Sequence, residues 1–214
     1  MKYFISAIFA GMMIAFGGVV FLSCAGLENG KVIGSFLFSL GLLTVVARGY
    51  DLYTGKVGYL SVNSKDTEKT PTNVAKTPLY YPAIILGNLV GTAIIGYAFR
   101  ATRSFGVSGI PERLQTMCNA KLNDNLFSIF LLACACGVMM FLAVDGYKKT
   151  KSWLFVILPV MVFILCGFEH CVANMFYFCA SDCWSVKTIV YVLVMILGNG
   201  VGAIIYKNIP REKK

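Results

Sequence analysis

A glutamate and the only histidine of the chain stand next to each other inside an apolar stretch of sequence. Glu169 and His170 interrupt the apolar run over residues 152–181. An ionisable side chain at the centre of a bilayer costs about 3 kcal/mol or more, so such a residue is by default a candidate for function. Imidazole exchanges protons near physiological pH, which makes His170 a candidate proton-exchange group. A buried structural histidine is the alternative reading of this residue taken by itself.

The glutamate is expected to play a different part. Successive residues of a helix point about 100° apart, so Glu169 faces a neighbouring helix when His170 faces a pore. A carboxylate is costly to bury without a partner. We therefore expect Glu169 to be structural and paired with a cation or with backbone donors.

The composition places both residues in a membrane protein. The chain has 214 residues, of which 57% are hydrophobic and only 14% are charged, whereas about half apolar is the average of globular proteins. Of its six charge-free runs, four are clearly long enough for the roughly 17–25 residues that a spanning helix needs, one is only just long enough and one is shorter. The sequence predicts an all-α membrane protein with six transmembrane helices in a single domain over residues 1–214. The runs cover residues 3–27, 32–47, 77–99, 125–144, 152–168 and 188–206.

The basic residues predict an orientation and argue against one class of partner. A net charge of +9 is compatible with nucleic-acid binding, but the basic residues lie between the apolar runs. With six crossings, more of them fall on cytoplasmic segments if both termini are cytoplasmic, as the positive-inside rule favours. We expect a multi-pass protein of the cell membrane whose partner is the lipid bilayer and not nucleic acid. The cytoplasmic set is Lys2, Lys65, Lys69, Lys76, Lys148, Lys149, Lys151, Lys207, Arg211, Lys213 and Lys214, and the outer set is Lys31, Arg100, Arg103, Arg113, Lys187 and Lys121.

The eight cysteines do not form a metal-binding pattern. The chain has no C-x-x-C pair, so the usual spacing of a zinc site is absent, and its one histidine excludes a bis-histidine haem. Most of the cysteines lie in apolar runs, where cysteine acts as a small hydrophobe. A membrane enzyme or redox protein is therefore disfavoured, and we expect no metal, no cofactor and no catalytic residue.

Two segments of the chain recur. Residues 86–95 (LGNLVGTAII) return at residues 197–205 (LGNGVGAII), and residues 49–52 (GYDL) return at residues 167–170 (GFEH). The order and similar offsets predict a duplicated unit of three segments, with one repeat over about 1–100 and the other over about 121–207. An odd number of crossings inserts the two repeats in opposite directions, and such proteins carry their site near the midplane. The Gly-Asn-x-x-Gly segments that contain Asn88 and Asn199 are read as helix-packing sites.

The second and fifth predicted segments look interrupted. The second meets Arg48, Gly49 and Asp51 after 16 charge-free residues, and the fifth meets Gly167 and Glu169 at the matching place. Non-helical backbone at membrane depth is tolerated only where protein or a water-filled cavity surrounds it. These interruptions predict a conduction or binding path.

At these residues the sequence resembles the formate/nitrite transporter family, which includes formate, nitrite, hydrosulfide and lactate channels. The resemblance covers nearly the whole chain. It is carried by residues 167–175 (GFEHCVANM), by residues 47–54 (ARGYDLYT), by Lys121 with 142–144 (LAV) 21 residues later, and by both Gly-Asn-x-x-Gly segments.

The resemblance implies an aquaporin-like bundle that assembles as a homopentamer with one pore in each protomer. It implies that His170 lies at the pore centre, that Lys121 lies in the outer vestibule, and that Thr54 is a hydrogen-bonding partner in the histidine region. The implied constriction consists of Phe38, Leu42, Leu52, Tyr53 and Phe163. The polar residues expected to hold the structure are Asp51, Glu169, Arg48, Asn174, Asn88 and Asn199.

Four residues depart from the family pattern: Gly137, Tyr53 in place of the usual phenylalanine, and Arg48 and Lys56, which add charge beside the interrupting loop. Gly137 stands where the family commonly has asparagine, so it is expected either to widen the central chamber or to leave room for a water molecule. For Arg48 three readings stay open: an ion pair with Asp51 or Glu169, an added anion-attracting charge, or a helix-end side chain that snorkels to water.

The resemblance and the chemistry of the residues together predict a channel for small monovalent anions or their conjugate acids. An unpaired anion is costly to pass through an apolar constriction, whereas a neutral acid is not. Lys121 would attract the anion and His170 would protonate it transiently. The alternative is an aquaporin-like pore for small neutral solutes, against which the absence of Asn-Pro-Ala turns and the presence of Lys121 and His170 argue.

Overall fold

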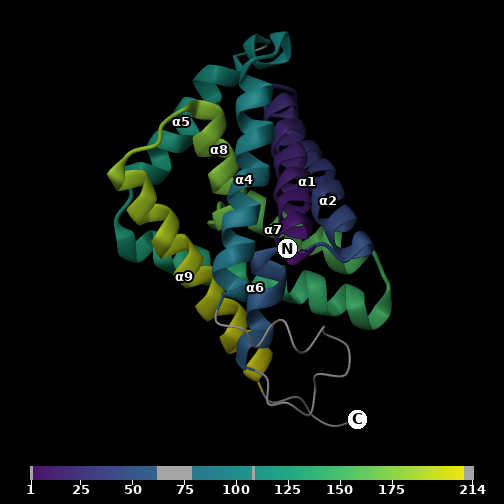
Figure 1. The fold of residues 1–214 in the computed structure, drawn as a ribbon. Coiled ribbons are helices and arrows are strands. Elements are labelled where there is room, and N and C mark those ends of the chain that lie inside the picture. Colours follow the sequence, from purple (N-terminus) through teal and green to yellow (C-terminus); the bar gives the residue numbers. More distant parts are fainter. Residues whose placement is uncertain (1, 62–78, 108, 210–214) are drawn as a thin grey trace.

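A computed structural model describes residues 2–61, 79–107 and 109–209, and this part of the chain is helical and has no strand (Figure 1). Six basic residues of the cytoplasmic set lie outside these ranges: Lys65, Lys69, Lys76, Arg211, Lys213 and Lys214. The elements are α1 (Lys2–Cys24), α2 (Gly30–Arg48), α3 (Tyr53–Lys56), η1 (Val57–Ser61), α4 (Tyr80–Arg100), η3 (Arg103–Gly106), α5 (Ile110–Leu122), α6 (Leu126–Thr150), α7 (Leu154–Leu165), α8 (Cys171–Ser181) and α9 (Val186–Asn208). The all-α prediction is confirmed.

The long helices are suited to a bilayer. Five of the described helices, α1, α2, α4, α6 and α9, are long and apolar enough to cross a membrane, whereas α7 and α8 have only 12 and 11 residues. Large apolar side chains also remain outside the bundle, and Leu40, Leu193 and Leu197 are each at least 59% exposed. Lipid solvates such a surface, whereas a water-soluble monomer rarely exposes so much of it. The chain is therefore a multi-pass membrane protein.

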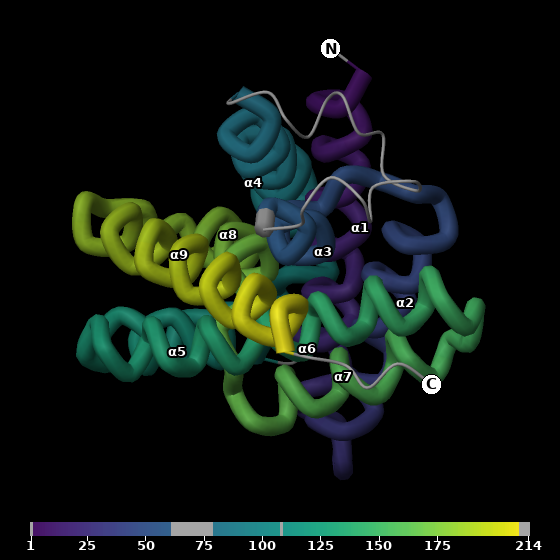
Figure 2. Tube along the Cα trace, turned by 90° about the horizontal axis from the view of Figure 1, so that it is seen from below, coloured from purple at the N-terminus to yellow at the C-terminus, as the bar shows by residue number. Residues whose placement is uncertain are grey.

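Two helix pairs cross at very short range. α1 packs against α4, and α6 packs against α9 (Figures 1 and 2). A Cβ atom on Gly11 of α1 would overlap the backbone of Asn88, and a Cβ atom on Gly137 of α6 would overlap the backbone of Asn199. Glycine allows this approach because it brings no side chain to the interface. The two crossings therefore use glycine and asparagine in the same way.

This packing corrects both expectations for Gly137. The glycine lies against the backbone of α9, so it neither widens a chamber nor leaves room for a water molecule. Its missing side chain is required by the helix crossing.

Two segments break between helices. α2 ends at Gly49 (φ 72°), after which Leu52 is extended and α3 begins. α7 is followed by Gly167 (φ 69°), after which His170 is extended and α8 begins. Glycine adopts this left-handed conformation without steric cost, so it ends each helix.

Asn88 stabilises the first break through all of its amide atoms. Its Oδ1 accepts a hydrogen bond from the Tyr53 N–H at 2.9 Å, and its Nδ2 donates to the carbonyls of Ala7 at 2.8 Å and Asp51 at 3.0 Å. The side chain thereby joins α1, the break and the start of α3. Its own exposure is 0%.

Asn199 makes the corresponding bonds at the second break. Its Oδ1 accepts from the Cys171 N–H at 2.9 Å, and its Nδ2 donates to the carbonyls of Ala133 and Glu169, both at 2.8 Å. Backbone groups released by a broken helix have no water to bond at membrane depth. The two asparagines supply the missing partners, a role that their sequence context does not indicate.

Gly137→Ala should destabilise the protein by about 1–3 kcal/mol, because an added methyl group overpacks a tight helix crossing. The thermal unfolding midpoint of the purified protein in detergent measures this effect. Gly106→Ala is the matched control, since nothing lies within 4 Å of a Cβ atom at that position. A Gly137→Ala midpoint equal to that of the control would contradict the close crossing.

Asn199→Asp should cost about 2–4 kcal/mol, because the new oxygen faces two carbonyl groups that the amide had satisfied. Asn88→Asp should lower the stability by a similar amount, for the same reason. Asn119→Asp on the exposed face of α5 is the control, because Asn119 accepts a hydrogen bond there from Gln115 and an aspartate still accepts it. Equal thermal midpoints for all three variants would show that the asparagines do not hold the breaks.

Candidate functional site

The two breaks meet at His170. This residue is 2% exposed and is the N-cap of α8, where its Nδ1 accepts the N–H of Ala173 at 3.0 Å. Its Nε2 lies 3.0 Å from Oγ1 of Thr54, the second residue of α3. One imidazole therefore connects the short helices that follow both breaks.

These contacts assign the tautomer of the ring. A neutral imidazole has one N–H and one acceptor nitrogen. Because Nδ1 accepts from Ala173, the hydrogen of neutral His170 is on Nε2 and is donated to Thr54 Oγ1. The hydroxyl hydrogen of Thr54 is then directed to another acceptor. Thr54 thus offers a donor at the centre of the molecule.

One phenylalanine ring stacks on the imidazole, and the other apolar residues of the expected constriction are buried. The Phe163 ring stacks on His170 with 5.6 Å between centroids, and Phe38 meets Phe163 edge-on at 5.7 Å. Leu42 and Leu52 are each 1% exposed. These four apolar residues of the expected constriction are therefore all buried in the core.

Tyr53 takes a position fixed by two hydrogen bonds. Its backbone N–H donates to Asn88, and its hydroxyl group donates to the carbonyl of Ile196 at 3.0 Å. The ring is 6% exposed, so Tyr53 is buried with the other four constriction residues. Its hydroxyl group is engaged with α9.

Glu169 has the cation that was expected for it, and this cation is Lys121. The Lys121 ammonium lies 2.8 and 3.0 Å from the two carboxylate oxygens, and the side chains are 14% and 5% exposed. Asn174 also donates to this carboxylate. The pairing of Lys121 was not predicted, and it means that the charge of this lysine is neutralised by a buried carboxylate. Breaking such a buried pair costs about 3–5 kcal/mol.

Asp51 occupies the corresponding place at the first break. Its carboxylate lies 3.2 Å from the Lys56 ammonium and accepts the Tyr80 hydroxyl at 2.8 Å. Each break thus carries a carboxylate with a lysine partner.

Of the three readings of Arg48, the ion pair with Asp51 or Glu169 is absent from the described residues. Both carboxylates pair with lysines instead. The reason lies in the backbone, since Gly49 turns the chain directly after Arg48 and leaves that side chain exposed at the end of α2. Lys56 lies on α3, beyond the break, and takes the place beside Asp51.

The described residues contain no cluster of three or more His, Cys, Asp and Glu side chains that could hold a metal ion. All eight cysteines are free, and His170 is engaged by Ala173 and Thr54. The chemistry of this centre is that of one imidazole, one hydroxyl group and buried apolar side chains.

Comparison with known proteins agrees with this architecture. Residues 1–210 match the sequence model of the family described as formate/nitrite transporter. The formate channel FocA of Haemophilus influenzae is 28% identical over 183 residues, which are 81% of this chain and 64% of that protein. A probable formate transporter of Methanothermobacter thermautotrophicus is 27% identical and is matched over 96% of this chain and 85% of its own length. The chain thus spans less than two thirds of the first relative and most of the second.

A solved structure of a pentameric formate channel with formate bound superposes with a TM-score of 0.81. It is 26% identical in sequence, and the superposition covers 96% of this chain and 93% of that one. The family match extends over nearly all of the chain. The chain therefore belongs to the formate/nitrite transporter family, a family of membrane transporters and not of enzymes.

Proposed function

We propose that this protein is a channel for small monovalent anions or their conjugate weak acids, with formate as the first candidate and nitrite or hydrosulfide as further members of the class. The observation that carries the proposal is the imidazole of His170, which bonds Thr54 beyond one break and caps the helix beyond the other. The relatives named as formate channels support the choice of substrate.

The buried apolar residues determine the form in which the substrate crosses. Phe38, Leu42, Leu52 and Phe163 offer an anion no compensating charge, so a bare anion meets a high desolvation cost. A neutral acid has a much lower cost. Transient protonation beside His170 converts one form into the other.

The proton comes from an imidazolium, because a neutral imidazole does not release its last proton near neutral pH. For His170 to bind a second proton, Nδ1 must first give up the N–H of Ala173. The loss of an N-cap costs about 1 kcal/mol. Proton exchange is therefore coupled to a small rearrangement at the start of α8, and Thr54 keeps Nε2 oriented.

The proposal includes topology and assembly. The chain forms one domain over residues 1–214, with six crossings as inverted repeats over about 1–100 and 121–207 and with both termini in the cytoplasm. The matching contacts of Asn88 and Asn199 support the repeat. The pentameric structure that covers 96% of the chain supports a homopentamer in the cell membrane.

The second candidate is an aquaporin-like pore for small neutral solutes. It is favoured by one observation, the neutralisation of Lys121 by Glu169, which leaves no free charge from this pair. A pore of this kind would conduct glycerol and would be insensitive to a pH gradient.

His170→Asn separates proton exchange from helix capping. The asparagine side chain caps a helix but does not exchange protons near neutral pH. Formate uptake into liposomes under an inward pH gradient should fall roughly 100-fold or more, the lower end of the range for general acid–base groups. His170→Phe should lose the uptake and also about 1 kcal/mol of stability.

The control for this pair is Asn125→Ser, which replaces the N-cap residue of α6 with another capping residue. This variant should take up formate at the wild-type rate. Acid-driven uptake that persists in a folded His170→Asn variant would rule out proton exchange at this residue.

The Lys121–Glu169 pair can be tested by a double-mutant cycle in Lys121→Met, Glu169→Gln and the double variant. Each single change should cost about 3–5 kcal/mol, because it leaves a buried charge without its partner, and the double variant should recover most of the loss. The exposed pair Arg100–Asp182, at 3.8 Å, should give a coupling below about 1 kcal/mol. Additive losses at Lys121 and Glu169 would show that the two charges do not depend on each other.

A further inference from the structure

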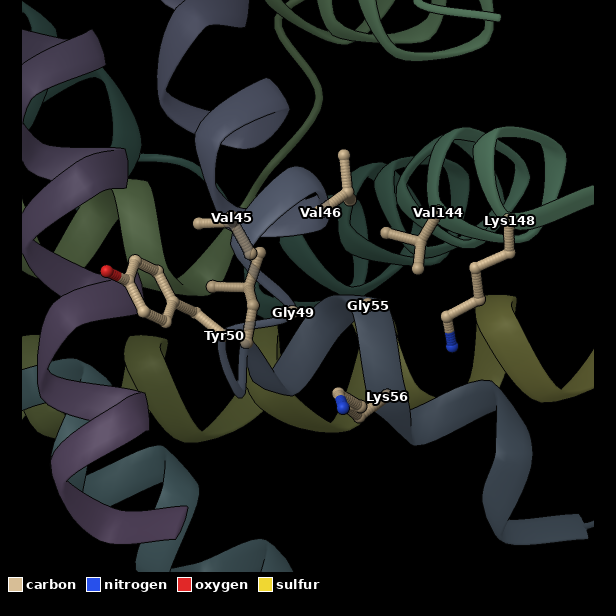
Figure 3. A pocket seen from close by; sticks show the side chains of 9 residues that line it. Val45, Val46, Gly49, Tyr50, Gly55, Lys56, Val144 and Lys148 are labelled. Atoms are coloured by element: carbon tan, nitrogen blue, oxygen red, sulfur yellow. The ribbon is translucent and has the colours of Figure 1, made fainter. Parts of the chain in front are cut away.

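A small cavity opens beside the first break. It has a volume of about 40 Å³ and lies between α2, α3 and α6 (Figure 3). By this measure one water molecule needs about 10–15 Å³, so about three waters or one anion with three heavy atoms have room. The residues that line the cavity include Gly49, Leu52, Lys56, Val144 and Lys148.

The cavity adjoins the constriction. Leu52 lines it and is 1% exposed, and the next residues along the chain are Tyr53 and Thr54, the latter bonded to His170. Gly49 lines it on the side of α2, where nothing lies within 4 Å of an added Cβ atom. A solute in this cavity is therefore separated from the histidine region by the residues of the break.

Two lysines line the cavity, and only one of them has a carboxylate partner among the described residues. The Lys56 ammonium lies 3.2 Å from the Asp51 carboxylate. Lys148 forms no ion pair within 4.0 Å in the described ranges, and its ammonium lies 4.2 Å from the centroid of the Tyr59 ring. An aromatic face attracts an ammonium but does not neutralise its charge.

Among the described residues, the carboxylates near Lys148 form ion pairs with other lysines. Asp145, one turn before it on α6, pairs with Lys149 at 2.6 Å, and Asp51 pairs with Lys56 at 3.2 Å. Lys56, Asp51 and Lys148 together therefore carry a net positive charge beside the cavity. The opposite break differs, because Lys121 is neutralised by Glu169.

We propose that Lys148, assisted by Lys56, forms a binding site for one small monovalent carboxylate or oxyanion at this mouth of the pore. The inference rests on the proposed function and adds a recruiting residue to it. Val45, Val46 and Val144 form the apolar wall of the cavity (Figure 3). A low-dielectric wall focuses the field of a nearby charge and raises the local concentration of the opposite ion.

The experiment uses the full-length protein in liposomes with its Lys148 side outward and follows formate uptake at one fixed inward pH gradient, because a formate ion that crosses with a proton carries no current. Wild-type uptake should saturate with external formate. Lys148→Gln should raise the half-saturating formate concentration roughly two- to fivefold, as expected for one solvated charge, and leave the maximal uptake rate unchanged. Lys148→Arg should restore the wild-type value.

Lys187→Gln is the matched control, since Lys187 also lies over an aromatic ring, 5.7 Å from the Tyr191 centroid, but does not line the cavity. It should leave the half-saturating concentration as in the wild type. If wild-type protein takes up formate but Lys148→Gln keeps the wild-type half-saturation, or if only its maximal uptake rate falls, the recruiting site is overturned. If wild-type protein takes up no more formate than protein-free liposomes, the proposed function itself fails.

Discussion

The structure depends on satisfying backbone polar groups where two helices break inside the apolar core. Asn88 and Asn199 each supply one acceptor and two donors to backbone groups around a break. An unsatisfied backbone group at membrane depth costs several kcal/mol, which exceeds the net contribution of an ordinary hydrogen bond. Without these amides the breaks would have to close into regular helix, and the imidazole would lose its position between them.

The same constraint accounts for the glycines around the asparagines. An amide reaches the carbonyl groups of a neighbouring helix only if the two backbones approach closely. Gly11 and Gly137 allow that approach, and each lies against the asparagine of the partner helix. Close crossing, asparagine and break therefore form one unit, which occurs twice in the chain.

Much of the fold could be predicted from local sequence patterns. The charge-free runs predicted an all-α membrane protein, and the glycine and acidic residues at Gly49 and Gly167 marked the places where the structure breaks. The burial of His170 followed from its apolar surroundings. These features depend on hydropathy and backbone conformation within one segment, which is why they can be read from the sequence.

The partners within the site could not be predicted in this way. Lys121 and Glu169 lie 48 residues apart and meet only because α5 packs against α8. Arg48 is nearer to Asp51 along the chain than Lys56 is, yet the turn at Gly49 leaves Lys56 as the partner. Gly137 was expected to leave empty space because it lacks the asparagine side chain of the family. In the structure the backbone of α9 occupies that space. Pairings of this kind depend on packing between segments.

The proposed mechanism requires a substrate anion to cross the apolar centre together with a proton exchanged at His170. The most direct measurement follows formate uptake and internal pH simultaneously in wild-type liposomes, with protein-free liposomes as the background. Roughly one proton should enter with each formate ion, because only the neutral acid crosses the constriction at low cost. Protein-dependent formate uptake that leaves the internal pH unchanged and generates a membrane potential would contradict it.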